Sequence, residues 1–523
     1  MKKYNKYIVL YVFTILFLSS CDRAFLEPWP PDAARTPEDV WGNYSYSKGF
    51  LDAIYADQIM SPYVNDITGN GMLASATDEA EHSLPSAGVQ DFTNGVWNPT
   101  NVPEVLFGGP WVSSRTWRSP WYNAYLGIRR ANIFLVGVNN SVLIDDPNDP
   151  TRSKERTYFK GQAYFWRAFL QFQLLRNYGS FPITTQVEII EGDIYKERNT
   201  MDECVNQIVK DCNSAIDSLP LLWDEANWHR INRTAAMALK SRVLLYYASP
   251  LYQGPFATYG TPANTIGDVK RWVDAADAAR IAVNENSFYD IPKVTKTTRP
   301  FSSAGAYNYI ISLLGNLENK EIIFSTGKTT QYSIQNEYHN LPAGVEGCNG
   351  YTNPTQEMVD AFEVVTGTGT SRQAVPFDWN NPVHAKAPYD NRDNRFYNVI
   401  LYNGYLWGTT TSRAYYIDTY VGGKHRDPML PNSTKTGYYY KKFLSESVYS
   451  YKSGDYTAPS RVRHEFRFAE LILNYAEAMN EAYGPYVIDP KGALRIGNIN
   501  TAKAAIDAIR ARVDMPALPL GLS

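Results

Sequence analysis

The clearest amphipathic pattern in the chain lies in residues 464–485. Read at helical spacing, its large apolar side chains fall on one face, and most of its carboxylates and amides fall off that face. The apolar face consists of Phe468, Ile472, Tyr475, Ala476, Met479 and Tyr483. Gly484 and Pro485 end the pattern, because glycine tolerates a positive φ and proline has no amide donor. The pattern predicts an amphipathic helix whose small residues, Ala469 and Ala476, let a second helix approach closely.

A candidate partner for this helix follows at residues 501–513. Thr501 is placed to cap its first turn. The residues expected to face inward are Ala505, Ile506, Ile509 and Val513. Two amphipathic helices joined by a short loop, with small residues between them, are typical of one unit in a helical-repeat array.

The same kind of pattern recurs in the first half of the chain. Helices are expected at about 50–60, 121–138, 154–178, 200–219, 232–248 and 272–283. Thr200 and Glu203 form a capping-box pattern at the start of one of them. The spacing predicts tetratricopeptide-like packing, in which each helix pair buries its apolar face only by stacking on its neighbours.

Two regions lack this helical texture. Residues 68–116 are rich in glycine, proline and asparagine and are predicted to form a long structured loop region. Residues 286–463 hold about half of the 39 tyrosines and consist mainly of turns, apart from a short buried strand expected at 321–325. We expect this second region to be an insertion that leans on the helices and has no core of its own.

Composition and charge limit the classes of partner. The chain has 523 residues, 44% of them hydrophobic, which is ample for a large buried core. Its formal net charge of −3 gives no electrostatic reason to bind nucleic acid. The 39 tyrosines and 12 tryptophans are the unusual feature. Such rings either pack in a core or offer flat faces on which sugar rings can stack.

The N-terminus predicts export and lipid anchoring. Lys2, Lys3 and Lys6 precede an apolar run at 7–18 that is too short to span a membrane but suits a signal peptide. Small residues then precede Cys21, as at a lipoprotein processing site, so Cys21 is the expected lipidated residue. The alternative is an ordinary secretory signal with a chance cysteine. Residues 1–20 are therefore excluded from the fold.

The sequence contains no pattern that predicts a catalytic centre, a metal site or a bound cofactor. The six histidines show no ligand spacing, and Cys204, Cys212 and Cys348 are expected to be small buried side chains rather than disulfides or zinc ligands. Carboxylate pairs such as Asp78 with Glu79, or Asp390 with Asp393, would fit a glycosidase. Most such pairs are solvated or salt-bridged, so we expect no catalysis.

Several segments together resemble one family. These segments are FRFAELILNYAEAMNE, AIDAIRARVDMP, GQAYFWRAFLQFQLLRNYGSFPI, NRTAAMALKSRVLLYYASP, NKEIIFS, YDNRDNRFYNVILYNG and TGYYYKKF. They resemble the SusD/RagB family of outer-membrane lipoproteins, which capture glycans for a SusC-like TonB-dependent transporter. The resemblance implies a mostly α, non-enzymatic protein that faces the cell exterior. It also implies one domain at 21–523, with helical repeats at about 36–285 and 464–513 and a ligand-facing insertion at about 286–463.

The candidate ligand-binding residues combine flat rings with nearby amides and carboxylates, which can hold sugar hydroxyls. Trp97 is the leading candidate, because it lies beside several asparagines in a loop that contributes to the glycan site in relatives. The other candidates are Asp78, Asn101, Tyr332, Tyr338, Trp379 and Trp407. Each of these aromatic residues has a plainer alternative, a packed or incidental ring. Trp166 and Trp272 lie within helical patterns and are expected in the core.

Two rival functions from other classes stay open at this stage. One is a surface glycoside hydrolase or lyase, and the other is a structural or adhesive lipoprotein without a sugar site. New reducing ends after incubation with glycans would indicate the first rival. Co-purification of a transporter without any glycan binding would indicate the second.

Overall fold

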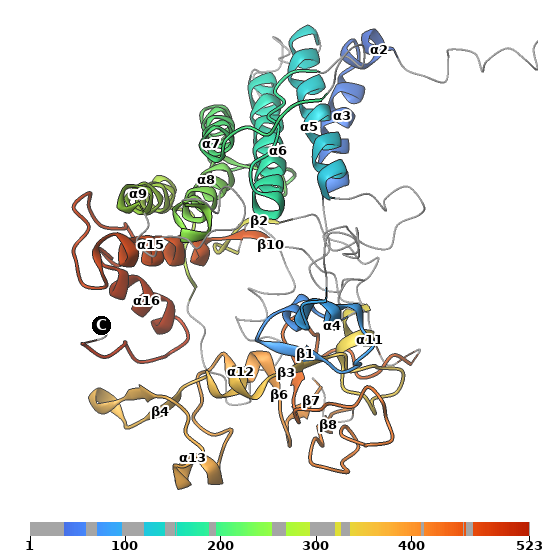
Figure 1. The fold of residues 1–523 in the computed structure, drawn as a ribbon, viewed down its shortest axis with the longest axis vertical. Helices are drawn as coiled ribbons and strands as arrows, with labels where there is room; N and C mark the ends of the chain where they lie inside the picture. Colours follow the sequence, from blue (N-terminus) through green and yellow to red (C-terminus); the bar gives the residue numbers. More distant parts are fainter. Residues whose placement is uncertain are drawn as a thin grey trace, which may run out of the picture.

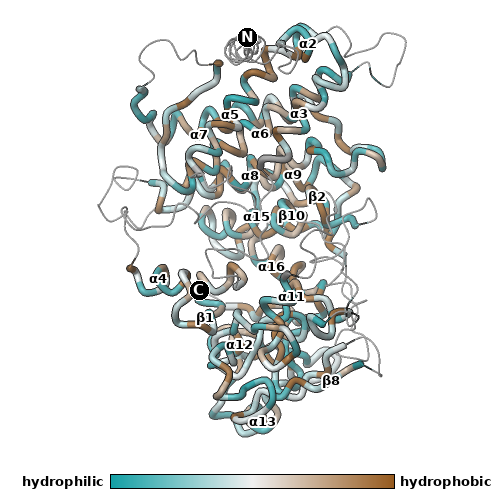
Figure 2. The backbone as a smooth tube through the Cα atoms, turned by 90° about the vertical axis from the view of Figure 1, so that its right-hand side faces the viewer, coloured by the Kyte–Doolittle hydropathy of each residue, from teal (hydrophilic) through white to brown (hydrophobic). Residues whose placement is uncertain are grey.

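The computed structural model describes residues 36–58, 71–96, 120–141, 152, 154–187, 195–253, 268–292, 319–325, 335–408, 413–452, 454, 456 and 464–521. The described residues form a helical array and, beside it, a part built from short elements and loops (Figure 1). Figure 2, turned by 90°, shows the same division, with α13 at the far end of the second part.

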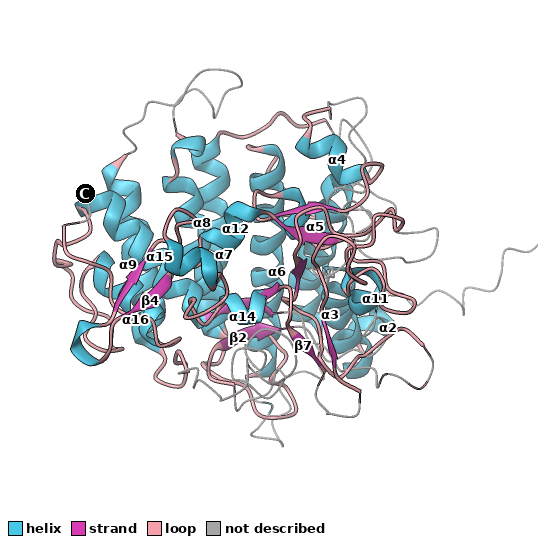
Figure 3. Cartoon of the chain, turned by 90° about the horizontal axis from the view of Figure 1, so that it is seen from below, coloured by secondary structure: helices cyan, strands magenta, loops and turns pink. Residues whose placement is uncertain are grey.

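The helical array is the main body of the protein. Its helices are α2 (Pro37–Trp41), α3 (Tyr44–Gln58), α5 (Pro120–Gly137), α6 (Glu155–Tyr178), α7 (Met201–Ser218), α8 (Arg233–Ala248), α9 (Val269–Glu285), α15 (Phe468–Tyr483) and α16 (Ala502–Ala511). Each helix from α5 to α9 packs against the next, α15 packs against α9, and α16 packs against α15. Seen from below, the helices lie side by side while the strands are short (Figure 3). This arrangement confirms the predicted helical scaffold with an insertion between α9 and α15.

Side-chain caps fix several helix starts where the sequence predicts them. The Thr200 hydroxyl accepts a hydrogen bond from the amide of Glu203 at 3.2 Å, and the Glu203 carboxylate accepts one from the amide of Thr200 at 2.8 Å. The predicted capping box is therefore present. Thr501 caps α16 through the amide of Ala504 at 3.1 Å. These bonds satisfy amides that the helices themselves leave unpaired.

The stretch 464–485 is not helical throughout. Its first four residues form strand β10 (His464–Arg467), which pairs antiparallel with β2 (Ile322–Ser325). Both Phe466 and Phe468 are fully buried, the first from the strand and the second from the first turn of α15. The helix prediction therefore extended four residues too far, because an apolar residue at every second position suits a strand as well. The buried strand predicted at 321–325 is confirmed.

A buried ion cluster ties β2, β10 and α16 together. Glu321 is fully buried, and its Oε1 accepts hydrogen bonds from Arg467 at 2.7 Å and from Arg512 at 2.9 Å. Its carbonyl also accepts from the amide of Phe468 at 2.8 Å. β2 lies early in the predicted insertion, and β10 comes directly after the end of that insertion. These contacts therefore bring the two ends of the insertion together.

The second part consists of short elements. In chain order these are η4 (Leu73–Ala76), β1 (Ala80–His82), α4 (Gly88–Thr93), α11 (Gln335–Asn340), β3 (Thr352–Pro354), α12 (Gln356–Asp360), β4 (Val364–Thr366), β5 (Gln373–Val375), α13 (Pro382–Lys386), α14 (Phe396–Val399), β6 (Ile400–Leu401), β7 (Leu406–Trp407), β8 (Tyr415–Tyr416) and β9 (Tyr439–Tyr440). The strands form antiparallel pairs: β1 with β3, β4 with β5, β6 with β9, and β7 with β8. Residues 71–96 thus join the insertion, although they lie far from it in the sequence.

The second part has a hydrophobic cluster of its own, so the expectation that the insertion lacks a core is wrong. The cluster is separate from the core of the helical array and includes Met72 and Ala80 from the early loop region. Among its largest buried side chains are Phe396, Tyr405, Trp407, Tyr439 and Tyr440. Aromatic side chains each bury a large area, so a dense set of them forms a core without long helices or strands.

This second core also holds a buried ion pair. Lys441 and Glu446 have side chains only 1% and 3% exposed, and Nζ lies 2.7 Å from Oε1. The hydroxyl of Tyr405 donates to the same Oε1 at 2.6 Å and accepts from Nζ at 2.6 Å. Burial lowers the pKa of Lys441, because the charged form loses its hydration. The three groups satisfy one another inside an otherwise apolar cluster.

Candidate functional site

A series of contacting aromatic rings runs across one region of the second part, and we call it the aromatic ladder. In order of contact its members are His82, Tyr351, His339, Tyr338, Tyr451 and Tyr456. Neighbouring ring centroids lie 4.5–6.0 Å apart. His82 is buried, whereas the other five rings are half-buried and thus partly open to solvent.

Backbone hydrogen bonds link the segments that carry the rings of the ladder. The amide of Tyr351 donates to the carbonyl of His339 at 2.9 Å, and that of Asn349 donates to the carbonyl of Tyr338 at 3.0 Å. The amide of Ser83 donates to the carbonyl of Tyr351 at 2.9 Å. Because β1 pairs with β3, His82 lies against the start of β3, next to Tyr351. The backbone of α11, β1 and the residue before β3 therefore positions four of the six rings.

Gly347 leaves space for Tyr451, one member of the ladder. Its φ of +77° lies in the left-handed region, which side chains rarely adopt. A Cβ at this position would lie 2.9 Å from the Cβ of Tyr451. Only glycine therefore lets the turn after α11 approach Tyr451 so closely.

Burial favours the neutral form of two rings of the ladder. Burial, and next the nearby His82, lower the pKa of His339 to about 4. Burial raises the pKa of Tyr351, because the phenolate would lose its hydration. Neutral rings at these two positions suit a ligand with an apolar face better than they suit an ion.

Exposed polar side chains lie on the same segment as His82, the buried end of the ladder. Glu81 and Asp78 are exposed, one in β1 and the other just before it. The amide of Gln90 donates to the carboxylate of Glu81 at 3.3 Å and to the carbonyl of His82 at 3.2 Å. Carboxylates and amides of this kind accept and donate hydrogen bonds to hydroxyl groups. Since side chains alternate along β1, the exposed Glu81 lies on the face opposite the buried His82.

The structure brings three of the predicted ligand residues to this part of the molecule. Tyr338 is a member of the ladder. The carbonyl of Asp78 accepts a hydrogen bond from the Thr355 hydroxyl at 2.8 Å, where α12 begins. Trp379 lies near the other end of α12 and is 46% exposed. Trp97, Asn101, Tyr332 and the lipidation residue Cys21 lie outside the described residues.

Trp407 does not have the exposed position that a stacking role requires. It is fully buried, and its indole N–H donates to the carbonyl of Val448 at 2.9 Å. Side chains alternate along a strand, so pairing of β7 with β8 turns Leu406 and Tyr416 outward and Trp407 inward. Trp407 is a core residue in this structure, and the prediction is corrected accordingly.

The predictions that two tryptophans lie in the core and that three cysteines are buried are confirmed. Trp166 and Trp272 are buried in the helical core, and Cys204, Cys212 and Cys348 are free, buried thiols. Asp393, one of the proposed glycosidase carboxylates, is 2% exposed and bound to Arg395 at 2.6 Å. In the part of the chain that the structure describes, no group of histidines, cysteines and carboxylates could hold a metal ion.

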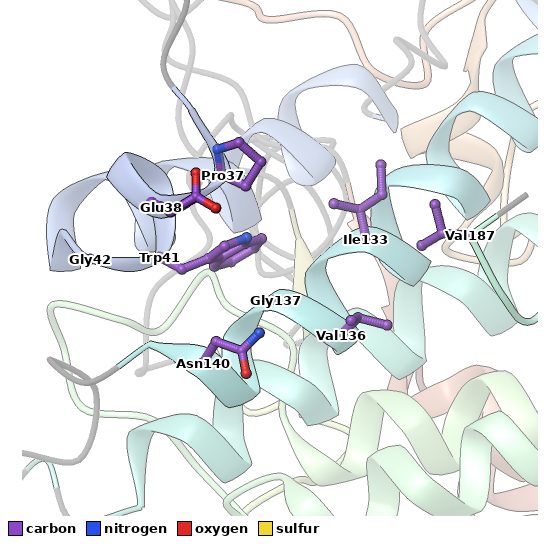
Figure 4. Close-up of a pocket in the computed structure, with 9 residues that line it drawn as sticks. All are labelled: Pro37, Glu38, Trp41, Gly42, Ile133, Val136, Gly137, Asn140 and Val187. Atoms are coloured by element: carbon purple, nitrogen blue, oxygen red, sulfur yellow. The ribbon is translucent and has the colours of Figure 1, made fainter. Parts of the chain in front are cut away.

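A separate groove of about 500 Å³ lies at the other end of the molecule, between α2 and α5 (Figure 4). The indole of Trp41 forms one wall and lies against Gly137, where a Cβ would come within 2.0 Å of the ring. Val136 and Ile133 add apolar surface, while Glu38 supplies the charge. α2 and the ladder elements β1 and α11 lie far apart in Figure 1, so the groove is not part of the ladder.

No helix among the described residues has both the length and the apolar character that crossing a membrane requires.

Comparison with known proteins gives a consistent result. A family model described as the SusD family matches residues 320–521, and one described as starch-binding and associating with the outer membrane matches residues 69–245. The SusD-like protein P38 of Formosa agariphila is 23% identical over 249 residues, which cover 47% of this chain and 43% of that protein. The chain thus spans less than half the length of this relative.

Two solved structures share the fold. A SusD-like protein from Bacteroides fragilis superposes with a TM-score of 0.68 at 22% identity, covering 94% of this chain and 83% of that one. A SusD-like carbohydrate-binding protein from the same species gives a TM-score of 0.59 at 19% identity, covering 92% and 80%. These likenesses agree with the mostly α architecture expected from the sequence.

Proposed function

Because the chain belongs to the SusD/RagB family, we propose that it binds oligosaccharides at the aromatic ladder and delivers them to a SusC-like TonB-dependent transporter. The observation that carries the proposal is the ladder itself, a series of contacting rings of which five are half-buried and thus partly open to solvent. A relative of the same fold is a carbohydrate-binding protein, which supports the ligand class.

The physical basis is stacking on rings that are already held in place. The C–H face of a sugar packs on an aromatic plane, while nearby amides and carboxylates bind its hydroxyls. Because the rings of Tyr338 and Tyr351 each pack against two neighbouring rings, little side-chain freedom is lost on binding. Trp97, Asn101 and Tyr332, which lie outside the described residues, remain candidate ligand-binding residues in the same proposal.

The proposal includes location and organisation. One family description places its members in association with the outer membrane. We place this protein there as a single domain at 21–523, held by a lipid on Cys21 and facing the cell exterior, with residues 1–20 removed as a signal peptide. Its role is binding and transfer, with no bond made or broken and no cofactor required.

Replacing Tyr338 with alanine is expected to weaken glycan retention roughly tenfold, about 1.4 kcal/mol, because one rung of the ladder is lost. The measurement is migration in native gels cast with starch, laminarin, xylan, pectin or alginate, compared with a gel without polysaccharide. Tyr195→Ala is the matched control, since Tyr195 is 91% exposed and precedes α7 in the helical array.

Three outcomes would count against the proposal. Equal retention of wild type and Tyr338→Ala would remove the ladder from the site. Free migration of the wild type through every gel would count against glycan binding altogether. New reducing ends in the glycan after incubation would indicate the rival hydrolase or lyase.

A further inference from the structure

Trp379 sits at the tip of a well-defined turn, apart from the aromatic ladder. The amide of Asn381 donates to the carbonyl of Asp378 at 3.1 Å, which closes the turn just before α13. Trp379 is 46% exposed, and its neighbours Asp378 and Asn380 are also exposed. The turn therefore presents an indole together with a carboxylate and an amide.

Two contacts fix the orientation of this indole. Its N–H donates to Oδ2 of Asp360 at 3.0 Å, and Oδ1 of the same carboxylate accepts from the amide of Gln356 at 2.9 Å. Phe377 packs edge-on, with ring centroids 4.9 Å apart and planes at 77°. Single exposed aromatics are common on protein surfaces. A ring held by a hydrogen bond on one edge and by a packed ring beside it is less common and is preorganised for stacking.

The support beneath Trp379 is itself rigid. Phe377 is 9% exposed and lies between the imidazole of His384, at 5.5 Å, and the guanidinium of Arg392, at 4.2 Å. Arg392 is 3% exposed and donates to the carbonyls of Val359, Phe362 and Pro388. These contacts anchor the turn to the end of α12.

α12 connects this turn to the aromatic ladder. Thr352 pairs with His82 of the ladder, and Asp360 binds Trp379. From Thr352 to the start of α12 the backbone is extended and covers about 10 Å, at roughly 3.3 Å per residue. The helix up to Asp360 adds about 7.5 Å, at roughly 1.5 Å per residue. Both Figure 1 and Figure 2 place α13 further from the helical array than α11 and β1. The two ring surfaces are thus distinct, and the backbone that joins them is at most about 18 Å long.

We propose that Trp379 is a second sugar-stacking platform, which binds a distal unit of the same oligosaccharide that the ladder holds. This inference rests on the proposed function and adds a length preference to it. Once one end of a chain is bound at the ladder, the other end is present at high effective concentration near Trp379. Long oligosaccharides should therefore bind more tightly than short ones, without any new contact at the ladder.

The test is a glycan array printed with oligosaccharides of increasing length and probed with wild type, Trp379→Ala, Tyr338→Ala and Val383→Ala. Val383 is 73% exposed in α13, so its substitution is a local control that leaves the indole in place. Trp379→Ala is expected to bind short oligosaccharides as the wild type does and to lose roughly tenfold on long ones. Tyr338→Ala is expected to weaken both.

A second variant distinguishes loss of the indole from misfolding of the turn. Trp379→Phe keeps a flat ring but loses the hydrogen bond to Asp360, so its affinity for long oligosaccharides should lie between those of wild type and Trp379→Ala. Unchanged binding of long oligosaccharides by Trp379→Ala would overturn this inference and leave the proposed function standing. Absence of wild-type binding to any glycan on the array would contradict the proposed function and this inference with it.

Discussion

Replacing Glu446 with alanine is expected to lower the free energy of unfolding by about 3–5 kcal/mol. The reason is that Lys441, 1% exposed, would lose its only counter-ion among the described residues, so it must either stay charged without a partner or release its proton, and both cost free energy. The hydroxyl of Tyr405 would lose its acceptor at the same time. Desolvating an unpaired ammonium costs more than the lost attraction alone. Chemical denaturation followed by circular dichroism measures the change.

Two controls separate this effect from the loss of any salt bridge. Glu346 pairs with Lys452 at 3.8 Å, with side chains 68% and 61% exposed, so Glu346→Ala should cost less than about 1 kcal/mol. Replacing both Lys441 and Glu446 with apolar residues of similar volume should recover most of the stability, because no charge is then left buried. Equal effects of Glu446→Ala and Glu346→Ala would show that the buried pair is not essential.

Acidification is expected to destabilise the fold strongly between about pH 6.5 and pH 4. Burial is the main cause that lowers the pKa of His339, His425 and His464 to about 4 in the folded protein. The unfolded chain, with ordinary histidine pKa values near 6.5, takes up protons first as pH falls. The stabilisation is therefore complete above about pH 6.5 and is lost as pH falls through about 4.

His425 gives the most specific version of this prediction. It is 1% exposed, and its Nδ1 accepts a hydrogen bond from the amide of Asp418 at 2.9 Å, which protonation of that nitrogen would break. Its share of the acid loss is about 3 kcal/mol, from a shift of about 2.5 pH units at 1.36 kcal/mol each. His425→Asn keeps an acceptor but cannot titrate, so its unfolding free energy should fall less steeply with pH. Parallel pH curves for wild type and variant would refute this assignment.

The helical array could be predicted from sequence because its signals are local. The capping box at Thr200 and the 3.6-residue apolar spacing act within one or two turns, so residues near one another in sequence determine the structure. The prediction failed at residues 464–467, where pairing with β2 decides between strand and helix. That partner lies about 140 residues earlier, and no local pattern reports it.

The candidate site was harder to predict because it is assembled from distant segments. Tyr338 was identified as an exposed aromatic, but its neighbours Tyr351 and Tyr451 were not, since their stacking depends on turns after α11. His82 joins the ladder only through pairing of β1 with β3, some 270 residues apart. Trp407 was misjudged because a two-residue strand carries no visible alternation. Loop length and composition alone do not show which rings turn inward.

Hydrogen–deuterium exchange with and without an oligosaccharide that the protein retains is the most direct test of the central claim. Binding at the aromatic ladder predicts slower exchange in peptides covering residues 335–351 and 80–83, whose amides lie along the stacked rings. Peptides from α6 to α8 should exchange at the same rate in both samples. Slowed exchange confined to the helical array, or to the groove between α2 and α5, would contradict the account.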